Sequence, residues 1–332
     1  MSRRTASLAN LSRVLRSREL MGRSRADSVE AVRVSVSALV KLNQAAAGLS
    51  LRSVRVRARM AGEYLSRSKG RGMEFAESRP YEPGDDVRNL NWRVMARTGK
   101  PFTKLFREER ERPVFVWIDL RDRMFFGTRR AFKAVAAARA AALIAWAANQ
   151  HGDRIGGVIF SDGVHHEIKP GRGKAAVLYL IRRLAEHAAW DQHGHAEHDD
   201  RSVREAMIRL RRVVRPGSLV FLLSDFANLD EVTEANLVQL GRHNELMLML
   251  IYDELESELP PPGNYRLSDG EDEFVLDAAD PNYRQLYAQR FADRVEKISS
   301  LARRNAMSLL MCRTDQDPFT VLHQALGANR RS

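Results

Sequence analysis

The chain has 332 residues, of which 44% are hydrophobic and 29% charged, and its net charge is +12. This length is enough for one large hydrophobic core with an accessory segment. A single cysteine, Cys312, excludes an internal disulfide and suits a reducing compartment. No run of eighteen apolar residues occurs, and no apolar stretch follows the basic N-terminus. We therefore expect no transmembrane helix, no signal peptide and a cytoplasmic location.

The positive charge is concentrated near the N-terminus. Residues 1–75 hold sixteen Lys and Arg against five Asp and Glu, so this quarter carries +11 of the net charge. A basic arm of this kind can bind nucleic acid, anionic lipid or an acidic protein surface. It can equally be a solvated segment that covers acidic parts of its own chain. Few aromatic residues lie here to stack on bases, so nucleic acid is the less favoured partner.

Two segments precede the main run of predicted elements. Residues 1–48 are rich in Arg, Ser and Ala, with an apolar spacing that fits helices, and we assign them to a basic arm that is helical or partly disordered. Residues 49–112 form a second segment. Its first part, 49–64, alternates Val and Arg, which predicts a strand with one solvated face. The sequence PGDD at 83–86 predicts a tight turn, because Pro fixes one dihedral angle and Gly allows the other.

Apolar stretches alternate with helical patterns over 113–315, and a C-terminal helix and tail follow over 316–332. This alternation is typical of a mostly parallel sheet with helices on both faces. The predicted fold class is therefore α/β, with a smaller strand-containing segment ahead of the sheet. The predicted strands are 114–119, 154–160, 163–169 (a hairpin mate of the strand before it), 218–224, 245–252 and 307–312, and the predicted helices are 129–150, 173–189, 200–213, 229–242 and 281–305.

Several predicted strands end on polar residues. Three of them end on Asp119, Asp225 and Asp253, and a fourth ends on Ser161-Asp162. In a parallel sheet, ligands bind at the carboxyl ends of the strands near the point where strand order reverses, so we expect these residues on one rim. Asp119 and Asp225 flank the central crevice if their strands are neighbours. Their oxygens suit a divalent ion, whereas Asp is also common turn chemistry where a strand ends.

A set of short motifs points to a known family. Upstream of the sheet they are Gly70-x-Gly72, Glu74-Phe75, Arg79-x-Tyr81-x-Pro83-Gly84-Asp85-Asp86, Arg88, Asn91-Trp92 and Ala96-Arg97-Thr98, and downstream they are GDRIGGVIF, LLSDF and YDELESELPPPGNYRLSDGE. The combination resembles the bacterial domain-of-unknown-function 58 family over roughly residues 50–315.

The resemblance implies a von Willebrand factor A-like, Rossmann-like domain behind a family-specific segment. It also implies an adaptor that works with a MoxR-type AAA+ ATPase on a client protein, in assembly, activation or metal insertion, and no catalytic activity is established for the family. Many members carry N-terminal membrane helices, which this sequence does not predict. We therefore expect a non-enzymatic cytoplasmic adaptor without a cofactor.

One motif of the family's fold departs from its usual form. A metal-binding domain of this kind carries Asp-x-Ser-x-Ser after its first strand, plus a Thr and an Asp from later loops. Asp119 matches the first Asp and Asp225 the last, but Arg121 and Arg123 stand at the Ser positions, and the loop KPGRGK lacks a hydroxyl. A guanidinium cannot ligate Mg²⁺ and can pair with either carboxylate instead. The alternative is that both arginines point into solvent and the site is vestigial.

We predict no metal; if one binds, Asp119 and Asp225 hold it. The predicted partner-binding residues fall into two groups. The first group lies along the rim and the second lies around the PGDD turn: Asp119, Arg121, Arg123 and Asp225, then Arg79, Asp85, Asp86, Arg88 and Arg97. Near the second group, we expect Trp92 and Phe75 to pack this segment onto the sheet domain rather than to dock a partner.

Two other functions stay open. Residues 1–75 suit a binder of nucleic acid or an anionic surface, whose affinity would fall steeply with salt. A metal-assisted hydrolase at the carboxylate rim would need a divalent ion. The stretch 186–200 holds His187, His193, His195 and His198 but has no closed metal-site spacing, and Cys312 fits a core strand better than a nucleophile. The client and the oligomeric state are not predicted by the sequence.

Overall fold

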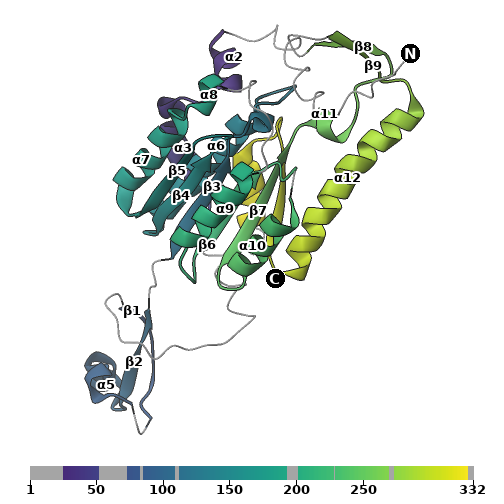
Figure 1. The fold of residues 1–332 in the computed structure, drawn as a ribbon. Coiled ribbons are helices and arrows are strands. Elements are labelled where there is room, and N and C mark those ends of the chain that lie inside the picture. The colour runs from purple at the N-terminus through teal and green to yellow at the C-terminus, as the bar shows by residue number, and fades with distance from the viewer. Residues whose placement is uncertain are drawn as a thin grey trace. The chain divides into compact units, whose positions relative to one another are not determined.

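The computed structural model describes residues 25–51, 73–82, 85–108, 112–192, 201–227, 229–268 and 273–327 (Figure 1). The chain divides into two compact units. The sheet unit comprises residues 1–59 and 112–332, and the hairpin unit comprises residues 60–111. No described helix is both long enough and apolar enough to cross a membrane.

The sheet unit is built on a six-stranded sheet in the order β10-β7-β6-β3-β4-β5 (Figure 1). All neighbouring strands are parallel except β4 and β5, which are antiparallel, as a hairpin pair must be. The strands are β3 (Pro113–Asp119), β4 (Arg154–Phe160), β5 (His165–Gly171), β6 (Leu219–Ser224), β7 (Glu245–Tyr252) and β10 (Ser308–Arg313). This mixed α/β sheet confirms the predicted fold class.

The strand order places one junction at the centre of the sheet. When the six strands are numbered along the chain, their order from the β5 edge is 3-2-1-4-5-6, so the direction of winding reverses between β3 and β6. Ligands of doubly wound sheets bind at such a reversal. Val114 pairs with Leu219 and Ile118 with Leu223, so the carboxyl ends of the two strands lie side by side. The condition under which Asp119 and Asp225 lie at the same junction, that their strands are neighbours, is therefore met.

One face of the sheet is covered by α3 (Val36–Ala46), α6 (Lys133–Gln150), α7 (Gly173–Ala185) and α13 (Pro318–Gly327). Alternate residues of β3, including Val116 and Ile118, are buried against these helices. Helix α6 is buried along nearly its whole length, and it packs against the sheet and against α3, α7 and α13. Its many Ala side chains allow this close approach on every side, since small residues leave the neighbouring elements room.

The other face is covered by α9 (Arg201–Val213), α10 (Glu231–Gly241) and α12 (Pro281–Arg304). The remaining residues of β3, Phe115 and Trp117, are buried on this side, as the two-residue period of a strand requires. Shorter elements lie between the main ones: α2 (Arg25–Val32), η2 (Asp122–Met124), α8 (Ala189–Gln192), α11 (Glu254–Ser257), β8 (Asn264–Ser268) and β9 (Glu273–Asp277).

The predicted arm 1–48 does not coincide with a structural boundary. Helix α3 packs on α6, with Leu39 and Ala46 almost wholly buried in the same core as the sheet. The indole of Trp146 also donates a 3.2 Å hydrogen bond to the carbonyl of Leu39. The apolar spacing that predicted a helix here also buries it, so at least residues 36–51 belong to the sheet unit.

Two predicted helices have different bounds. The helix predicted from 129 begins at Lys133, because residues 120–132 form η2 and a loop over the strand ends. The helix predicted over 173–189 ends at Ala185, and α8 follows it. Trp190 of α8 donates a 2.8 Å hydrogen bond through Nε1 to the carbonyl of Leu184, so α8 is tied to the last turn of α7.

The hairpin unit pairs β1 (Met73–Pro80) with β2 (Phe102–Glu108) in an antiparallel ladder. Between the strands lie η1 (Val87–Asn89) and α5 (Trp92–Thr98). Helix α5 ends at Gly99, whose φ of 69° is the left-handed conformation that glycine adopts most readily. The predicted turn at Pro83-Gly84, and all but the first three residues of the strand predicted over 49–64, lie outside the described residues.

Candidate functional site: a carboxylate rim with internal cations

Asp119, the last residue of β3, is fully buried and accepts four hydrogen bonds. Its Oδ1 accepts from the backbone N–H and the Nε of Arg121, both at 3.0 Å. Its Oδ2 accepts from Nη2 of Arg121 at 2.7 Å and from Oγ of Ser224 at 2.6 Å. A carboxylate has about four lone-pair positions, so these donors from the chain itself saturate Asp119.

Arg121 makes a bidentate contact with Asp119 through Nε and Nη2, which we call the Arg121 fork. Arg121 is itself only 4% exposed. Its Nη2 also lies 3.9 Å from Oδ1 of Asp225, and its guanidinium lies 5.9 Å from the ring centre of Phe160. Burial alone lowers the pKa of the guanidinium, but Asp119, Asp225 and Asp162 together outweigh burial and the net pKa is raised. Arg121 is therefore a fixed internal cation, and the alternative in which it points into solvent is wrong.

Asp225, which follows β6, is the second buried carboxylate of the rim. Its Oδ2 lies 3.0 Å from Nζ of Lys133 and 3.6 Å from Nε of Arg123, and its Oδ1 accepts from the backbone N–H of Ala227 at 3.1 Å. Burial raises the pKa of Asp225, but Lys133, Arg123 and Arg121 outweigh burial and hold this pKa well below its ordinary range. Asp225 is therefore ionised near neutral pH.

Lys133 is the rim residue that sequence reasoning missed. It begins α6, is 1% exposed, and bridges Asp225 to Oε1 of Glu256 at 2.9 Å. Nη1 of Arg294 lies 3.8 Å from the same Glu256 oxygen, so the chain of charges reaches α12. A Lys at the start of an Ala-rich helix normally predicts a solvated helix end. The available signal is that five apolar residues follow it directly, which places it on a buried helix.

The other two predicted strand ends on this edge make structural contacts. Asp253 is fully buried, and it accepts hydrogen bonds from the N–H and hydroxyl of Thr128, the hydroxyl of Thr314 and the N–H of Leu255. It thus joins the loop before α6 to the ends of β7 and β10. Asp162 accepts from the backbone N–H of Asp122 at 2.7 Å, and burial is the main cause that raises its pKa.

These residues do not fit a divalent metal ion. A cation that bound Asp119 would have to displace Arg121 from both carboxylate oxygens, and the buried guanidinium would repel it. Within the described part of the chain, no group of three or more His, Cys, Asp or Glu is arranged to hold a metal. The chemistry that the rim offers is charge-assisted hydrogen bonding.

The two predicted groups of partner-binding residues belong to different units of the chain. The four rim residues come together, whereas the other five lie in the hairpin unit. There, Nη2 of Arg79 lies 2.7 Å from Oδ1 of Asp85, and Oδ2 of Asp85 accepts from the Glu82 N–H and the Thr103 hydroxyl. The Glu82 N–H is the largest cause of the lowered pKa of Asp85.

The remaining three residues of that group differ from this internal pair. Asp86 accepts a 3.0 Å hydrogen bond from the backbone N–H of Arg88 and so caps η1. The side chains of Arg88 and Arg97 are exposed. This group of five residues thus consists of an internal ion pair (Arg79 and Asp85), a helix cap (Asp86) and two exposed arginines (Arg88 and Arg97).

His187 is the member of the predicted His-rich stretch that the structure describes, and the other three histidines lie outside the described residues. It is 1% exposed, its Nδ1 accepts from the N–H of Ala189, and its ring contacts that of His166 at 5.1 Å between centres. Burial, followed by the nearby His166 and His165, lowers the pKa of His187 to about 4. It is therefore neutral at pH 7.

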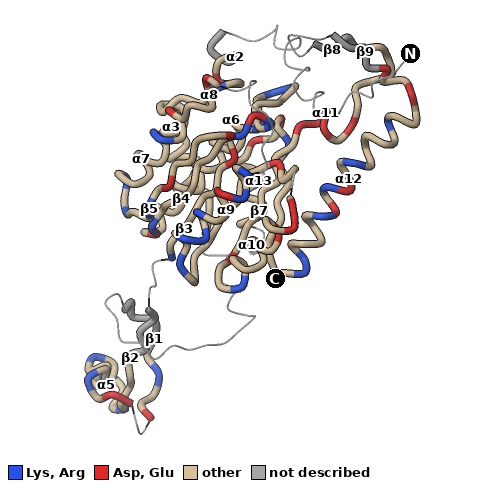
Figure 2. Tube along the Cα trace, viewed as in Figure 1, with Lys and Arg blue, Asp and Glu red and all other residues tan. Residues whose placement is uncertain are grey.

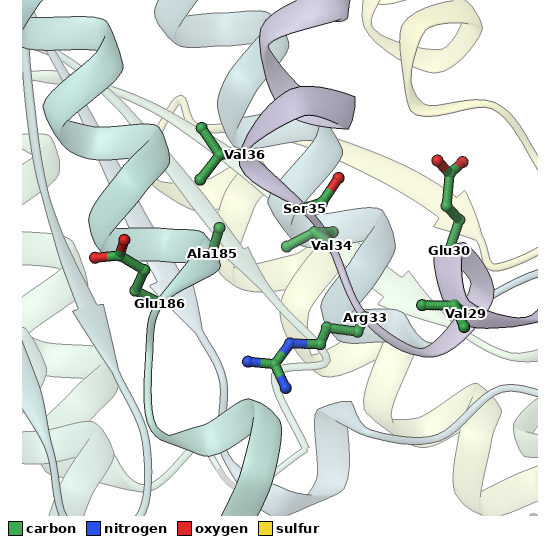
Figure 3. A pocket seen from close by; sticks show the side chains of 8 residues that line it. All are labelled: Val29, Glu30, Arg33, Val34, Ser35, Val36, Ala185 and Glu186. Atoms are coloured by element: carbon green, nitrogen blue, oxygen red, sulfur yellow. The ribbon is translucent and has the colours of Figure 1, made fainter. Parts of the chain in front are cut away.

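A hollow of about 550 Å³ is lined by residues 29, 30 and 33–36 and by Ala185 and Glu186 (Figure 3). Arg33 points into it from the turn between α2 and α3, and its guanidinium is ion-paired with Asp191. Val34, Val36 and Ala185 supply apolar walls. None of the predicted site residues lines it.

The comparison with protein families matches residues 77–297 to the family described as "Protein of unknown function DUF58". The match takes in most of the hairpin unit's described residues and continues into α12. The chain belongs to the DUF58 family.

Its relatives include two mycobacterial proteins. "Uncharacterized protein Rv1480" of Mycobacterium tuberculosis and "Uncharacterized protein Mb1516" of Mycobacterium bovis are each 28% identical to the chain over 271 residues. The aligned region covers 81% of this chain and 84% of each relative. The alignment with these relatives therefore takes in most of the chain, including parts of both units.

Two solved structures are similar at a lower level. The "conserved hypothetical protein BatB" from Bacteroides thetaiotaomicron is 12% identical with a TM-score of 0.41, covering 67% of this chain and 100% of that one. An "aerotolerance-related membrane protein" from Bacteroides fragilis is 12% identical with a TM-score of 0.39, covering 65% and 97%. At these scores neither likeness carries an argument about the function of the DUF58 chain.

Proposed function

We propose that this chain is a non-enzymatic adaptor whose rim contacts a partner protein without a bound metal ion. The proposed partner is a MoxR-type AAA+ ATPase, which acts together with the chain on a client protein in the cytoplasm. The family resemblance supports the partner, and the rim geometry supports the metal-free contact. The observation that carries the proposal is the fork of Arg121 on buried Asp119.

The finer fold proposal is a von Willebrand factor A-like sheet with a degenerate metal motif. The parallel sheet with one antiparallel edge strand supports it, as does Asp119 at the end of the first strand of that sheet. In this proposal, Arg121 supplies from within the chain the positive charge that a divalent ion supplies in metal-binding domains. Because the fork is buried and saturated, the charge is in place before any partner arrives.

Arg123 is the rim cation best placed to meet a partner. Its side chain is 23% exposed, against 5% for Arg121 and 1% for Lys133. Its Nε lies 3.6 Å from Oδ2 of Asp225, which keeps the guanidinium beside the carboxyl end of β6. A carboxylate of the partner that approached this edge would form a charge-assisted hydrogen bond with Arg123, and chelators would not disturb that bond.

The test measures the affinity of the purified ATPase for the purified chain. The chain is treated with EDTA and dialysed before the Mg²⁺–nucleotide-loaded ATPase is added in trace-metal-free buffer. We expect binding to survive this treatment, and Arg123→Gln to weaken it about tenfold through loss of one charged contact. The matched control is Arg209→Gln, which removes an exposed arginine from α9.

Two results would reject the proposal. One is binding that disappears after chelation of the chain alone and returns with Mg²⁺. The other is an Arg123→Gln variant that binds as tightly as the Arg209→Gln control.

A further inference from the structure

The hairpin unit presents a tryptophan to solvent. Trp92 is 60% exposed, the highest value among the exposed large apolar side chains of the described residues, and Val87 nearby is 57% exposed. The other three tryptophans of the chain, Trp117, Trp146 and Trp190, are all buried. Large apolar side chains scattered singly on a surface are ordinary, but an exposed Trp beside a second apolar residue is typical of binding surfaces. Within the described hairpin unit Trp92 is thus exposed, and the expectation that it packs this segment onto the sheet domain stays a prediction.

Trp92 stands on a well-anchored helix. Asn91 caps α5 by accepting from the N–H of Val94 through Oδ1, and its Nδ2 donates a 2.8 Å hydrogen bond to Ser78 of β1. Gly99 closes the other end with a hydrogen bond from its N–H to the carbonyl of Met95. Leu90, just before the helix, is buried and bridges to Thr103 of β2. The exposure of Trp92 thus belongs to a fixed element, which lowers the entropy cost of using it as an anchor.

The surroundings of Trp92 are strongly basic. Residues 87–107 contain six Lys and Arg and no Asp or Glu. Arg88, Arg93 and Arg97 are exposed, and no described acidic side chain forms an ion pair with them. Figure 2 shows Lys and Arg along α5. Two acids precede this stretch: Asp85 is engaged by Arg79, and Asp86 accepts a hydrogen bond from the backbone N–H of Arg88, so neither side chain is ion-paired with Arg93 or Arg97.

The five side chains project from one short stretch of backbone. Arg93 and Arg97 are four residues apart on α5 and therefore share a face, and Trp92 is the first residue of the same helix. Only two residues separate η1, which carries Val87 and Arg88, from α5. We call this set (Val87, Arg88, Trp92, Arg93 and Arg97) the Trp92 surface.

We propose that the Trp92 surface binds an acidic segment of a partner protein, with an apolar side chain of that segment packed on Trp92. Exposed cations attract a complementary anionic surface, and an interface places its aromatic anchor at the centre with charges around it. Single-stranded nucleic acid would need several stacked aromatic platforms along a basic groove, and one exposed Trp favours a protein anchor instead. The inference rests on the proposed adaptor function, because it names the chemistry of one partner.

The first experiment places a photo-crosslinking amino acid, p-benzoylphenylalanine, at Ala96 in the full chain in its host. Ala96 is exposed and lies one turn from Trp92, so the surface itself stays intact. The same amino acid at Arg212 on α9 is the control position, which is also exposed. We expect a protein crosslink at 96 whose peptide, sequenced by mass spectrometry, has an excess of Asp and Glu and an apolar residue.

The second experiment titrates the crosslinked segment, made as a synthetic peptide, into the full chain. Because Trp92 is the exposed tryptophan, a blue shift of emission reports its burial. We expect Trp92→Ala to abolish this signal, and a competition assay to show affinity at least about tenfold weaker for Arg93→Glu/Arg97→Glu and at higher salt. The control is Ile208→Ala/Arg209→Glu, which changes an exposed apolar residue and an arginine on α9 and should leave the affinity unchanged.

The proposal is overturned by a crosslink to nucleic acid, by a crosslinked segment without acidic excess, or by crosslinking no stronger than at the control position. An affinity that charge reversal leaves unchanged also overturns it. Failure of this surface and failure of the rim are separable. An intact crosslink at 96 with no ATPase binding rejects the rim contact alone, and ATPase binding that depends on Arg123 without a crosslink rejects the Trp92 surface alone.

Discussion

Arg121 neutralises the carboxylate of Asp119, which is fully buried. Removing it leaves Asp119 buried with one remaining side-chain donor, Ser224, and takes a cation from Asp225. We predict that Arg121→Ala lowers the free energy of unfolding by about 3–5 kcal/mol, the range for breaking a buried ion pair. Urea denaturation measures it. Arg209→Ala is the surface control, and a loss no larger than that of the control would mean that the fork does not hold the rim.

His187 should make stability depend on pH. Its pKa is about 4 in the folded chain and near 6.5 in the unfolded chain, so between these values the unfolded state binds more protons. The contribution is fully present above pH 6.5 and is lost as the pH falls toward 4, by about 3 kcal/mol in total. Denaturation midpoints at pH 7 and pH 5 for wild type and His187→Leu measure this. Equal pH slopes in the two proteins would contradict the assignment.

Some residues of the rim could be predicted from the sequence and others could not. Asp119, Asp225 and the two arginines could be predicted because they follow buried strands, and a strand end has a defined place in a parallel sheet. Lys133 could not, because a helix start carries no comparable rule, and its burial depends on β6 and α11 lying against α6. The internal bonds of Asp253 were missed for the same reason, since Thr128 and Thr314 lie far from it in sequence.

At the scale of elements, α3 is the segment whose role differs most from expectation. Leu39 is 1% exposed and packs in the core shared with α6. We predict that Leu39→Ala costs about 2–5 kcal/mol of unfolding free energy, as for other buried leucines. Thermal or urea denaturation measures it, with Val36→Ala, at the 38% exposed start of the same helix, as the control. Equal effects of the two substitutions would place α3 outside the core.

The burial of α3 in the core limits how the basic arm can be tested by truncation. Removing residues 1–48 would delete α3 and disturb the core, so loss of any activity would be ambiguous. Removing residues 1–24, which lie outside the described residues, leaves α2 and α3 in place. The periodicity of the sequence correctly predicted helices in this region, but periodicity cannot say which neighbour covers an apolar face, because that depends on strands more than sixty residues away.

At the scale of the whole molecule, the two units have separate interiors. Both described cores of the sheet unit draw their members from residues 31–51 and 112–327, and none from the hairpin unit. We predict that replacing residues 60–111 with a flexible Gly/Ser linker leaves a cooperative sheet unit whose unfolding free energy changes by less than about 1 kcal/mol. Urea denaturation and near-ultraviolet circular dichroism measure it, and a molten variant would contradict the division.

The overall strand order was predictable only in part. Alternating strands and helices indicate a parallel sheet, and a short turn before residues 163–169 indicates a hairpin with an antiparallel edge. The reversal of winding between β3 and β6 follows from no local pattern, because right-handed crossovers allow either direction along the sheet. That reversal nevertheless brings Asp119 beside Ser224 and Asp225, and so it creates the rim.

The most direct test of the account is a calorimetric titration of Mg²⁺ and Mn²⁺ into the purified chain and into Arg121→Ser/Arg123→Ser. If Arg121 is the internal cation of the rim, wild type shows no binding up to about 5 mM, whereas the double variant binds with a Kd in the range of about 10⁻⁴–10⁻³ M and gains thermal stability on doing so. Submillimolar, saturable binding to wild type would contradict the account, because it would require the ion and the Arg121 fork to share Asp119.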